Sequence, residues 1–458
     1  MCKGPPERAE ASDAVRSSDR GSERGRRRRW LMAGGLLVAA TAATCVWPWV
    51  RGQRYLTAAR RALEVGDLES ALTLLGAAET RQPASGEVQY VLAVANRRAG
   101  RLDRFRVHLR QAKERRWPAA DLERQEWLAT AQVGDVEAVR GRLLALAERG
   151  AGDGQAEEIC EALTRGCLAA YRLREAWKYL EMWLQWRPED PQAHLLRAYV
   201  HEQLEQLPLA VEDYRATLAQ LPNHRDAHFK LAELLYQQGT LDEAEAHFQA
   251  CVDSDASDVD ALIGTARCAV RRGSAAAAQL ALDAASSLPL TTAQRANVLA
   301  ERGRARLQEG QIRDAVEILS QAVELAPAEL TIQLSLATAL ARSGQPEQAK
   351  LHHERLRQIT ARRNRLGDIT RALVANPNDA DLRCEAGTIL IELGLAVEGV
   401  GWLKTALACV PIHPGSHRAL ADYYAVSGNQ RLSAVHRSAA ETAARQPIGE
   451  APTKEVTP

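Results

Sequence analysis

Apolar and small residues recur along this chain about every 34 residues, from Gly52 almost to the C-terminus. Each period has a Gly or a substitute for it before its second helical stretch, a small residue five positions further on, and usually a closing Pro. Gly239, Ala244 and Phe248 show the spacing, and so does the stretch from Gly310 to Pro327. A period of this length is typical of helix–turn–helix arrays. The pattern therefore predicts an all-α chain of stacked helix pairs.

The phase of this pattern holds over about eleven units between residues 52 and 447. The units are 52–85, 86–119, 120–153, 157–190, 191–224, 225–258, 259–292, 296–329, 330–363, 380–413 and 414–447. The units occupy almost the whole chain, so no room remains for a separate catalytic domain. Whatever the protein does, we expect it to do by binding.

About sixteen residues, 364–379, interrupt the array. They either extend the second helix of the ninth unit or break that helix at Gly367. The predicted organisation is therefore an array over 52–363, an insert or extended helix over 364–379, and a C-terminal array over 380–447. Residues 448–458 are predicted to be a disordered tail.

The units resemble the tetratricopeptide repeat. At the motif positions of that family, the unit 191–224 has His194, Arg197, Ala198, His201, Glu205, Ala210, Tyr214, Thr217 and Pro222. The resemblance implies two antiparallel helices in each unit and a right-handed α-solenoid over residues 52–447. It also implies that partner proteins or peptides bind on the concave face of the solenoid.

Small residues and glycines fit this fold physically. Small side chains at positions 8 and 20 of a unit, such as Ala59 with Ala71 or Ala232 with Ala244, let the two helices approach closely. A Gly at position 15 ends the first helix, where a left-handed residue is favoured. The glycines at this position are Gly66, Gly100, Gly134, Gly239, Gly273, Gly310, Gly344, Gly394 and Gly428.

The composition of residues 1–50 predicts where in the cell the protein is located. Residues 1–29 form a polar, basic tail that ends in the run Arg26 to Arg29, and residues 30–50 carry no charge. Twenty-one helical residues at about 1.5 Å each span a hydrocarbon core of about 30 Å. The excess of Arg before the segment favours a cytoplasmic N-terminus. We therefore expect a disordered cytoplasmic tail, one transmembrane helix in a bacterial inner membrane, and repeats on the extracytoplasmic side.

Two other interpretations of this segment remain open. Ala40–Thr41–Ala42 resembles a signal-peptidase site, and cleavage there would release the repeats as an exported soluble adaptor. Arg27 to Leu31 also resembles, loosely, a twin-arginine signal.

Composition and motifs give no support for chemistry. The formal net charge is +1, so nucleic acid is not an expected partner. The eight cysteines form no CxxC pair, and no zinc-ligand spacing, Walker loop or GxSxG motif occurs. Histidines at position 4, such as His194, His228 and His417, are expected as core packing residues. We predict no enzyme, metal or cofactor; the alternative from another class is a non-autonomous subunit of an enzyme complex.

The family resemblance implies a binding face at positions 2, 5, 9, 12 and 13 of the first helices. The central residues of this face are Tyr199, Glu202, Phe229, Glu233 and Tyr236, and the flanking arginines are Arg97, Arg98, Arg165, Arg267, Arg271, Arg304 and Arg342. Aromatic rings flanked by Arg would suit an extended or helical peptide with acidic groups. The same residues are also compatible with solvated or partly packed helix faces.

Overall fold

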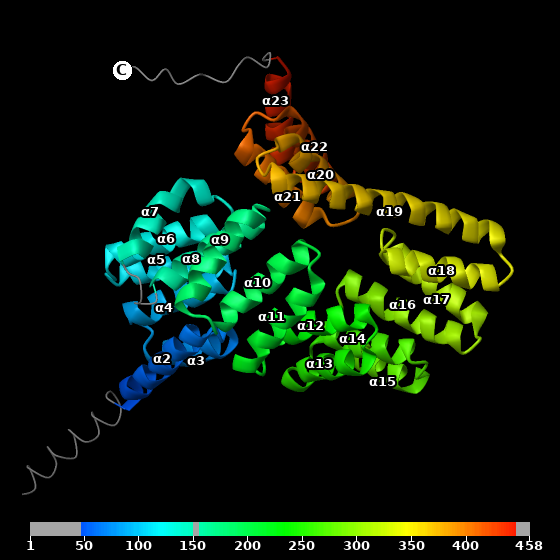
Figure 1. Cartoon of the computed structure of the whole chain (residues 1–458), viewed down its shortest axis with the longest axis horizontal. Coiled ribbons are helices and arrows are strands. Elements are labelled where there is room, and N and C mark those ends of the chain that lie inside the picture. The colour runs from blue at the N-terminus through cyan, green and yellow to red at the C-terminus, as the bar shows by residue number, and fades with distance from the viewer. Residues whose placement is uncertain (1–46, 150–154, 446–458) are drawn as a thin grey trace, which may run out of the picture. The chain divides into compact units, whose positions relative to one another are not determined.

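A computed structural model describes residues 47–149 and 155–445 of the chain. Within these ranges the structure has 22 helices and no strand, so the predicted all-α class is confirmed (Figure 1). The chain divides into two compact parts, one up to Gln125 and one from Glu126 onward. We call them the N-terminal body and the C-terminal body.

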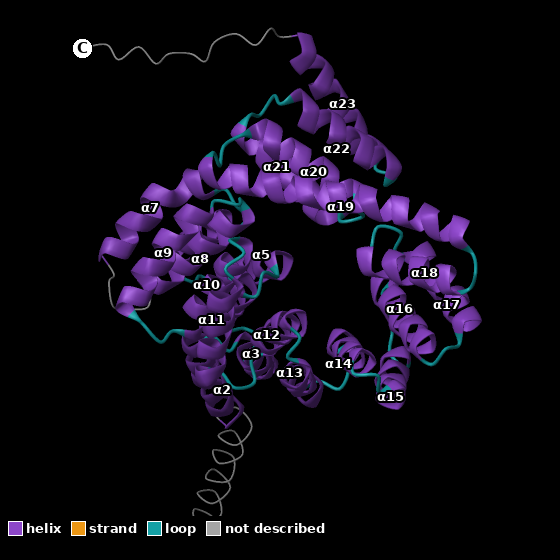
Figure 2. Ribbon diagram, turned by 45° about the vertical axis from the view of Figure 1, so that its right-hand side comes forward, coloured by secondary structure: helices purple, strands orange, loops and turns teal. Residues whose placement is uncertain are grey.

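The helices alternate with short turns throughout both bodies (Figure 2). In the N-terminal body they are α2 (Trp47–Val65), α3 (Leu68–Arg81), α4 (Gly86–Arg98) and α5 (Leu102–Glu114), and α6 (Ala119–Gln132) contains the boundary. The first half of the C-terminal body has α7 (Val136–Arg149), α8 (Gln155–Ala169), α9 (Leu173–Trp186), α10 (Pro191–Gln203), α11 (Leu207–Gln220), α12 (Arg225–Gln238), α13 (Leu241–Ser254) and α14 (Val259–Arg271). Its second half has α15 (Ala275–Ser286), α16 (Thr292–Gln308), α17 (Ile312–Leu325), α18 (Leu330–Arg342), α19 (Pro346–Ala375), α20 (Ala380–Glu392), α21 (Ala396–Cys409), α22 (Pro414–Val426) and α23 (Gln430–Arg445).

Small residues sit where paired helices meet. Ala59 of α2 and Ala71 of α3 are both fully buried, as are Ala232 of α12 and Ala244 of α13. The first helix of a repeat packs against its second helix at these points, because a side chain no larger than a methyl group lets the two backbones come close. The predicted close contacts are thus confirmed.

Glycine ends the first helix in nine repeats, with φ between 72° and 100°. All nine are the glycines expected at position 15. The two repeats without Gly there place Tyr171 (φ 52°) and Glu205 (φ 58°) in the same left-handed region. An L-residue in this conformation crowds its Cβ against the following carbonyl and costs about 1–2 kcal/mol, so these two positions are strained.

The interruption after residue 363 is a longer helix. α19 continues through Gly367 to Ala375 as one 30-residue helix, about 45 Å long at about 1.5 Å per residue (Figures 1 and 2). Of the two alternatives for this segment, the structure therefore has the extended helix and not the break at Gly367.

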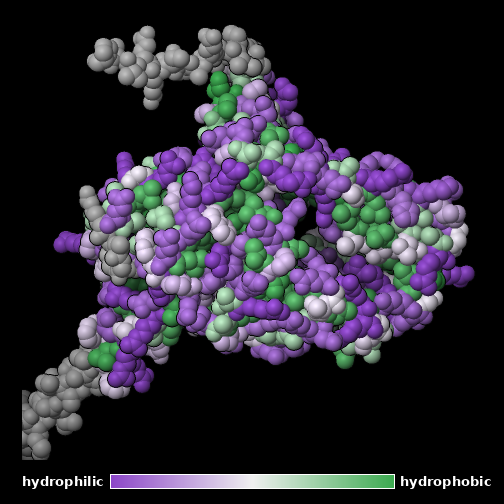
Figure 3. Space-filling model, viewed as in Figure 1, coloured by the Kyte–Doolittle hydropathy of each residue, from purple (hydrophilic) through white to green (hydrophobic). Residues whose placement is uncertain are grey.

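Most of the predicted membrane segment lies outside the described residues. Only its last four residues, 47–50, are described, and they form the first turn of α2. No described helix combines the length and the apolar character that a membrane crossing requires. On the face drawn in Figure 3, hydrophobic side chains are interspersed among hydrophilic ones. The anchor stays a prediction from the sequence.

Candidate protein-interaction surface

The central candidate residues come from neighbouring first helices of the C-terminal body and share one face. Tyr199 and Glu202 lie on α10; Phe229, Glu233 and Tyr236 lie on α12; Arg267 and Arg271 lie on α14; Arg304 lies on α16. We call these eight residues the groove face. Side-chain contacts link α10 to α12, α12 to α14 and α14 to α16. The repeat spacing therefore does bring the residues of the groove face together.

Three aromatic rings on the groove face are half-buried. Tyr199 packs edge-on against Tyr214, with 6.0 Å between ring centroids. Phe229 packs in the same way on Phe248 at 5.6 Å. The ring of Tyr236 has the guanidinium of Arg267 at 4.6 Å from its centroid. One side of each ring is thus held by the repeat, while part of its surface remains open to a partner.

Charged side chains on the groove face form a ladder across the repeats. Lys230 lies 3.8 Å from Glu202 on one side, and Arg267 lies between Glu233 at 3.6 Å and Glu301 at 3.8 Å. Arg304 donates to Glu301 from Nε at 3.0 Å. Opposite charges therefore alternate across α10, α12, α14 and α16, and Arg267 and Arg304 are already paired with carboxylates of this chain.

The polar edge of the aromatic patch is anchored by a buried tyrosine. The Tyr214 hydroxyl donates a hydrogen bond to Glu202. Burial raises the pKa of Tyr214 and of its neighbour Tyr199. Both phenols therefore remain neutral, and each can act as a hydrogen-bond donor over the physiological pH range.

Several of the predicted binding arginines cap the neighbouring repeat. Arg98 donates to the Leu63 carbonyl at 2.6 Å, and Arg271 donates to the Tyr236 carbonyl at 2.6 Å. Arg342 makes the same bond to the Leu307 carbonyl at 3.0 Å. Each bond joins residues 35 apart, at the end of the preceding first helix, where carbonyls lack intrahelical partners and a cation is favoured. These arginines hold successive repeats together, a role that their positions in the repeat did not indicate.

Two flanking arginines differ from the expectation of a free binding face. Arg97 is fully buried in the N-terminal body, and its Nε donates to the Gln125 side chain at 2.9 Å. Its assignment to a binding face was wrong, because the next helix covers the guanidinium. Arg165 is half-buried and pairs with the buried Glu161 one helical turn earlier, at 3.1 Å.

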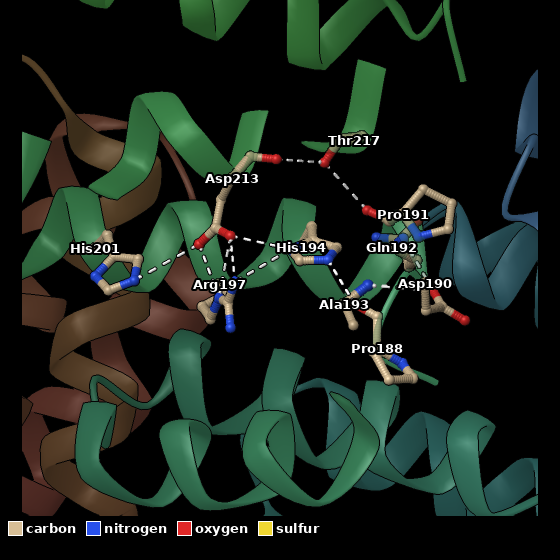
Figure 4. A network of polar contacts seen from close by, with 10 residues as sticks. All are labelled: Pro188, Asp190, Pro191, Gln192, Ala193, His194, Arg197, His201, Asp213 and Thr217. Carbon is tan, nitrogen blue, oxygen red and sulfur yellow. Dashed lines mark hydrogen bonds and ion pairs between the residues drawn. The ribbon is translucent and has the colours of Figure 1, made fainter. Parts of the chain in front are cut away.

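Position 4 of the repeats carries a polar bridge instead of simple core packing. The Nε2 of His194 bonds the Pro188 carbonyl at 2.8 Å, and its Nδ1 bonds Asp213 at 3.0 Å (Figure 4). The same bridge recurs at His228, which joins the Pro222 carbonyl and His247. The expectation that these histidines are packing residues thus needs correction: they are half-buried, and they tie a turn to a second helix.

Asp213 is the centre of the most extensive of these bridges. It is almost fully buried and accepts hydrogen bonds from Arg197 and from His194, and His201 lies 3.6 Å away (Figure 4). Burial alone would raise the pKa of Asp213, but the hydrogen bonds from His194 and Arg197 outweigh it and lower that pKa. The carboxylate is therefore a charged structural centre, enclosed by Arg197 and two histidines of its own repeat.

The described part of the chain offers neither a metal-binding cluster nor, at Cys160 and Cys167, a reactive thiol. No group of three or more His, Cys, Asp or Glu side chains there is arranged to hold a metal ion. Cys160 and Cys167 are free and buried, and burial raises the pKa of each thiol to about 12. Both thiols remain protonated and are poor nucleophiles.

The fold and this surface define a repeat protein in which stacked helix pairs present a row of first-helix side chains. The chain belongs to the tetratricopeptide repeat family. A sequence profile of that description matches residues 56–121, 168–224, 195–259 and 229–289, and a second one matches residues 306–365. No curated protein matches the sequence.

Several solved structures are similar to parts of this chain at low identity. PilW, a widely conserved type IV pilus biogenesis factor, is 19% identical with a TM-score of 0.38, over 44% of this chain and 93% of PilW. The thermophilic TPR protein TTC0263 of Thermus thermophilus is 21% identical with a TM-score of 0.32, over 40% of this chain and 99% of its own. YrrB, described as a TPR protein with an unusual peptide-binding site, is 17% identical with a TM-score of 0.26, over 45% and 96%.

Proposed function

We propose that this protein is a scaffold that binds a partner protein or peptide on the groove face and performs no chemistry of its own. The observation that carries the proposal is the juxtaposition of three half-buried rings, those of Tyr199, Phe229 and Tyr236, beside a ladder of charges on adjacent first helices. Partly exposed aromatic side chains on a rigid support are the residues that most often dominate binding energy in protein interfaces.

The charge ladder restricts which partner fits. Arg267 already lies between two carboxylates, so a purely acidic peptide would have to displace Glu233 or Glu301 from it. A segment with apolar side chains for the rings, and only one or two carboxylates, meets less competition. We therefore propose an amphipathic segment, extended or helical, as the occupant.

The proposed location is the bacterial inner membrane. Residues 30–50 would anchor the chain, the arginines before them would stay in the cytoplasm, and the repeats would serve an envelope assembly on the extracytoplasmic side. Membrane fractionation with N-terminal sequencing tests this location. A mature chain that begins near Ala43 would replace the anchored scaffold by an exported soluble adaptor.

Site-specific photo-crosslinking in cells tests the groove face. A photoreactive phenylalanine at position 199, 229 or 236 should give a shared partner adduct. The same residue at Leu280 should not, because this side chain is 75% exposed on α15, a second helix away from the groove face. Tyr199→Ala, Phe229→Ala and Tyr236→Ala should each weaken recovery of the captured partner. Equal adducts at position 280 and at the groove positions would refute the site.

A further inference from the structure

Two segments about 200 residues apart in sequence contact each other within the C-terminal body. The turn between α8 and α9 meets α20 and α21, as both views show (Figures 1 and 2). Tyr171 packs on Trp402 with 5.2 Å between ring centroids, and Arg172 donates to the Asn378 side chain at 3.0 Å. Repeats in a solenoid normally touch only their neighbours, so this contact is additional to the repeat pattern.

A hydrophobic cluster underlies the contact. Tyr171 from the turn before α9 and Leu173 from the start of α9 are buried together with Ile369 and Leu373 from the last turns of α19. Ile389 from α20 is buried in the same cluster. Both segments contribute apolar side chains that are less than a tenth exposed. Separating the segments would return this apolar surface to water, so the contact is stabilised by burial as well as by polar bonds.

Arg383 supplies the most specific polar bond. It occupies position 4 of its repeat, where His and Gln elsewhere bond the carbonyl of their own preceding turn. Its Nε makes that bond to Pro377 at 2.8 Å, but its Nη2 also donates to the Ala170 carbonyl at 2.6 Å. The side chain is 1% exposed. A buried guanidinium needs several acceptors, and one of these lies on the distant turn.

The two repeats that lack Gly at the end of the first helix are the two that take part. Tyr171 and Glu205 have φ of 52° and 58° in the place where nine other repeats have Gly. Tyr171 contacts Trp402, and Glu205 lies 3.5 Å from Arg371 of α19. Glycine would relieve the backbone strain but would provide no side chain. Strained non-glycine residues persist where the side chain has a role that the surrounding structure maintains.

We propose that these contacts form a latch: Tyr171, Arg172 and Ala170 on one side close onto Trp402, Asn378 and Arg383 on the other. The latch joins the two ends of the α10–α18 array that carries the groove face. When the latch is closed, the helices from α9 to α21 form a closed ring, and a partner must fit within that ring to reach the groove face. When the latch opens, the two ends of the array separate, and the partner can reach the groove face from the side. This control of access rests on the proposed function, whereas the latch itself does not.

Chemical crosslinking of the full chain tests the latch without a partner. Arg172→Cys with Asn378→Cys, in a background of Cys2→Ala, Cys45→Ala, Cys384→Ala and Cys409→Ala, should be joined in high yield by a short bis-maleimide. Each chain with only one of the two introduced cysteines should not; Cys160, Cys167, Cys251 and Cys268 stay, because they are buried. Adding Tyr171→Gly should lower the yield at least fivefold. This substitution relieves the backbone strain of the turn but also removes a buried ring, so unchanged circular dichroism is required to show that the helices remain folded.

Trp402→Ala should lower the crosslinking yield similarly. Arg365→Ala is the matched control, because Arg365 pairs with Glu385 at 2.6 Å between α19 and α20 and makes no bond to the α8–α9 turn. Absence of crosslinking in the parent pair, or an unchanged yield with Tyr171→Gly and Trp402→Ala, would overturn the latch. The photo-adduct at Tyr236 is measured separately, so failure of the groove proposal is distinguishable from failure of the latch.

Discussion

Removal of the Asp213 carboxylate should destabilise the repeat at 191–224 far more than removal of an exposed carboxylate at a similar distance from its arginine. Asp213 lies 2.6 Å from Arg197, and its side chain is 4% exposed. Asp283 lies 2.7 Å from Arg302, and its side chain is 57% exposed. The two ion pairs have almost the same length, so burial is the main variable.

The magnitude follows from the charge that remains behind. Breaking a buried pair by removal of one partner costs about 3–5 kcal/mol. Arg197 is itself 30% exposed and can regain some hydration, so we expect the lower end, about 3 kcal/mol, for Asp213→Ala. The exposed pair is screened by water, and Asp283→Ala should cost about 0.5 kcal/mol. Arg197→Met with Asp213→Leu should cost less than Asp213→Ala alone, because no cation is then left unpaired.

Native-state hydrogen exchange is the appropriate assay, because repeat arrays open unit by unit and α10 and α11 can be followed separately. Asp213→Ala should raise exchange in these helices about a hundredfold at neutral pH, and Asp283→Ala should raise it in α15 and α16 only two- to threefold. Because the pKa of Asp213 is lowered on folding, its stabilisation is complete above the unfolded value of 3.8 and is lost as the pH falls through the folded value. Equal effects of the two substitutions would refute the reasoning.

Three further predictions concern other repeats. Glu205→Gly should stabilise α10 and α11 by about 1 kcal/mol, because Gly adopts the left-handed φ of 58° without strain; urea unfolding that shows no gain contradicts this. Gly264→Ala should lower the melting temperature by several degrees, because a Cβ would lie 2.5 Å from the Phe248 ring; an unchanged melt would show that the ring yields. Burial lowers the pKa of His247, so its repeat should lose stability as the pH falls below about 6.5. In thermal melts from pH 7 to 5, the melting temperature of the parent chain should therefore fall more steeply than that of His247→Gln.

Local pattern was enough to predict the fold of the described residues. The small residues at positions 8 and 20 and the glycines at position 15 specify each helix pair, because their requirements are met within one repeat. Ala232 and Ala244 are fully buried where the 34-residue phase placed them, and Gly239 has the expected left-handed φ of 87°. The alternating charges of the groove face could also have been predicted, because Glu233, Arg267 and Glu301 follow one another at 34-residue intervals.

The roles of particular side chains depended on neighbours that the sequence pattern does not specify. Arg97 and Arg271 looked alike along the chain, yet one is buried against Gln125 and the other caps α12. The difference arises because an arginine can reach any unpaired carbonyl or amide nearby, and only packing decides which one is near.

The repeat, its helix pairs and the row of first helices that carries the groove face follow from the amino-acid pattern, since each depends on contacts between adjacent helices. The tertiary structure decided the contact of Tyr171 with Trp402 and of Arg383 with Ala170, because small rotations accumulate from repeat to repeat and only their sum brings such distant turns together.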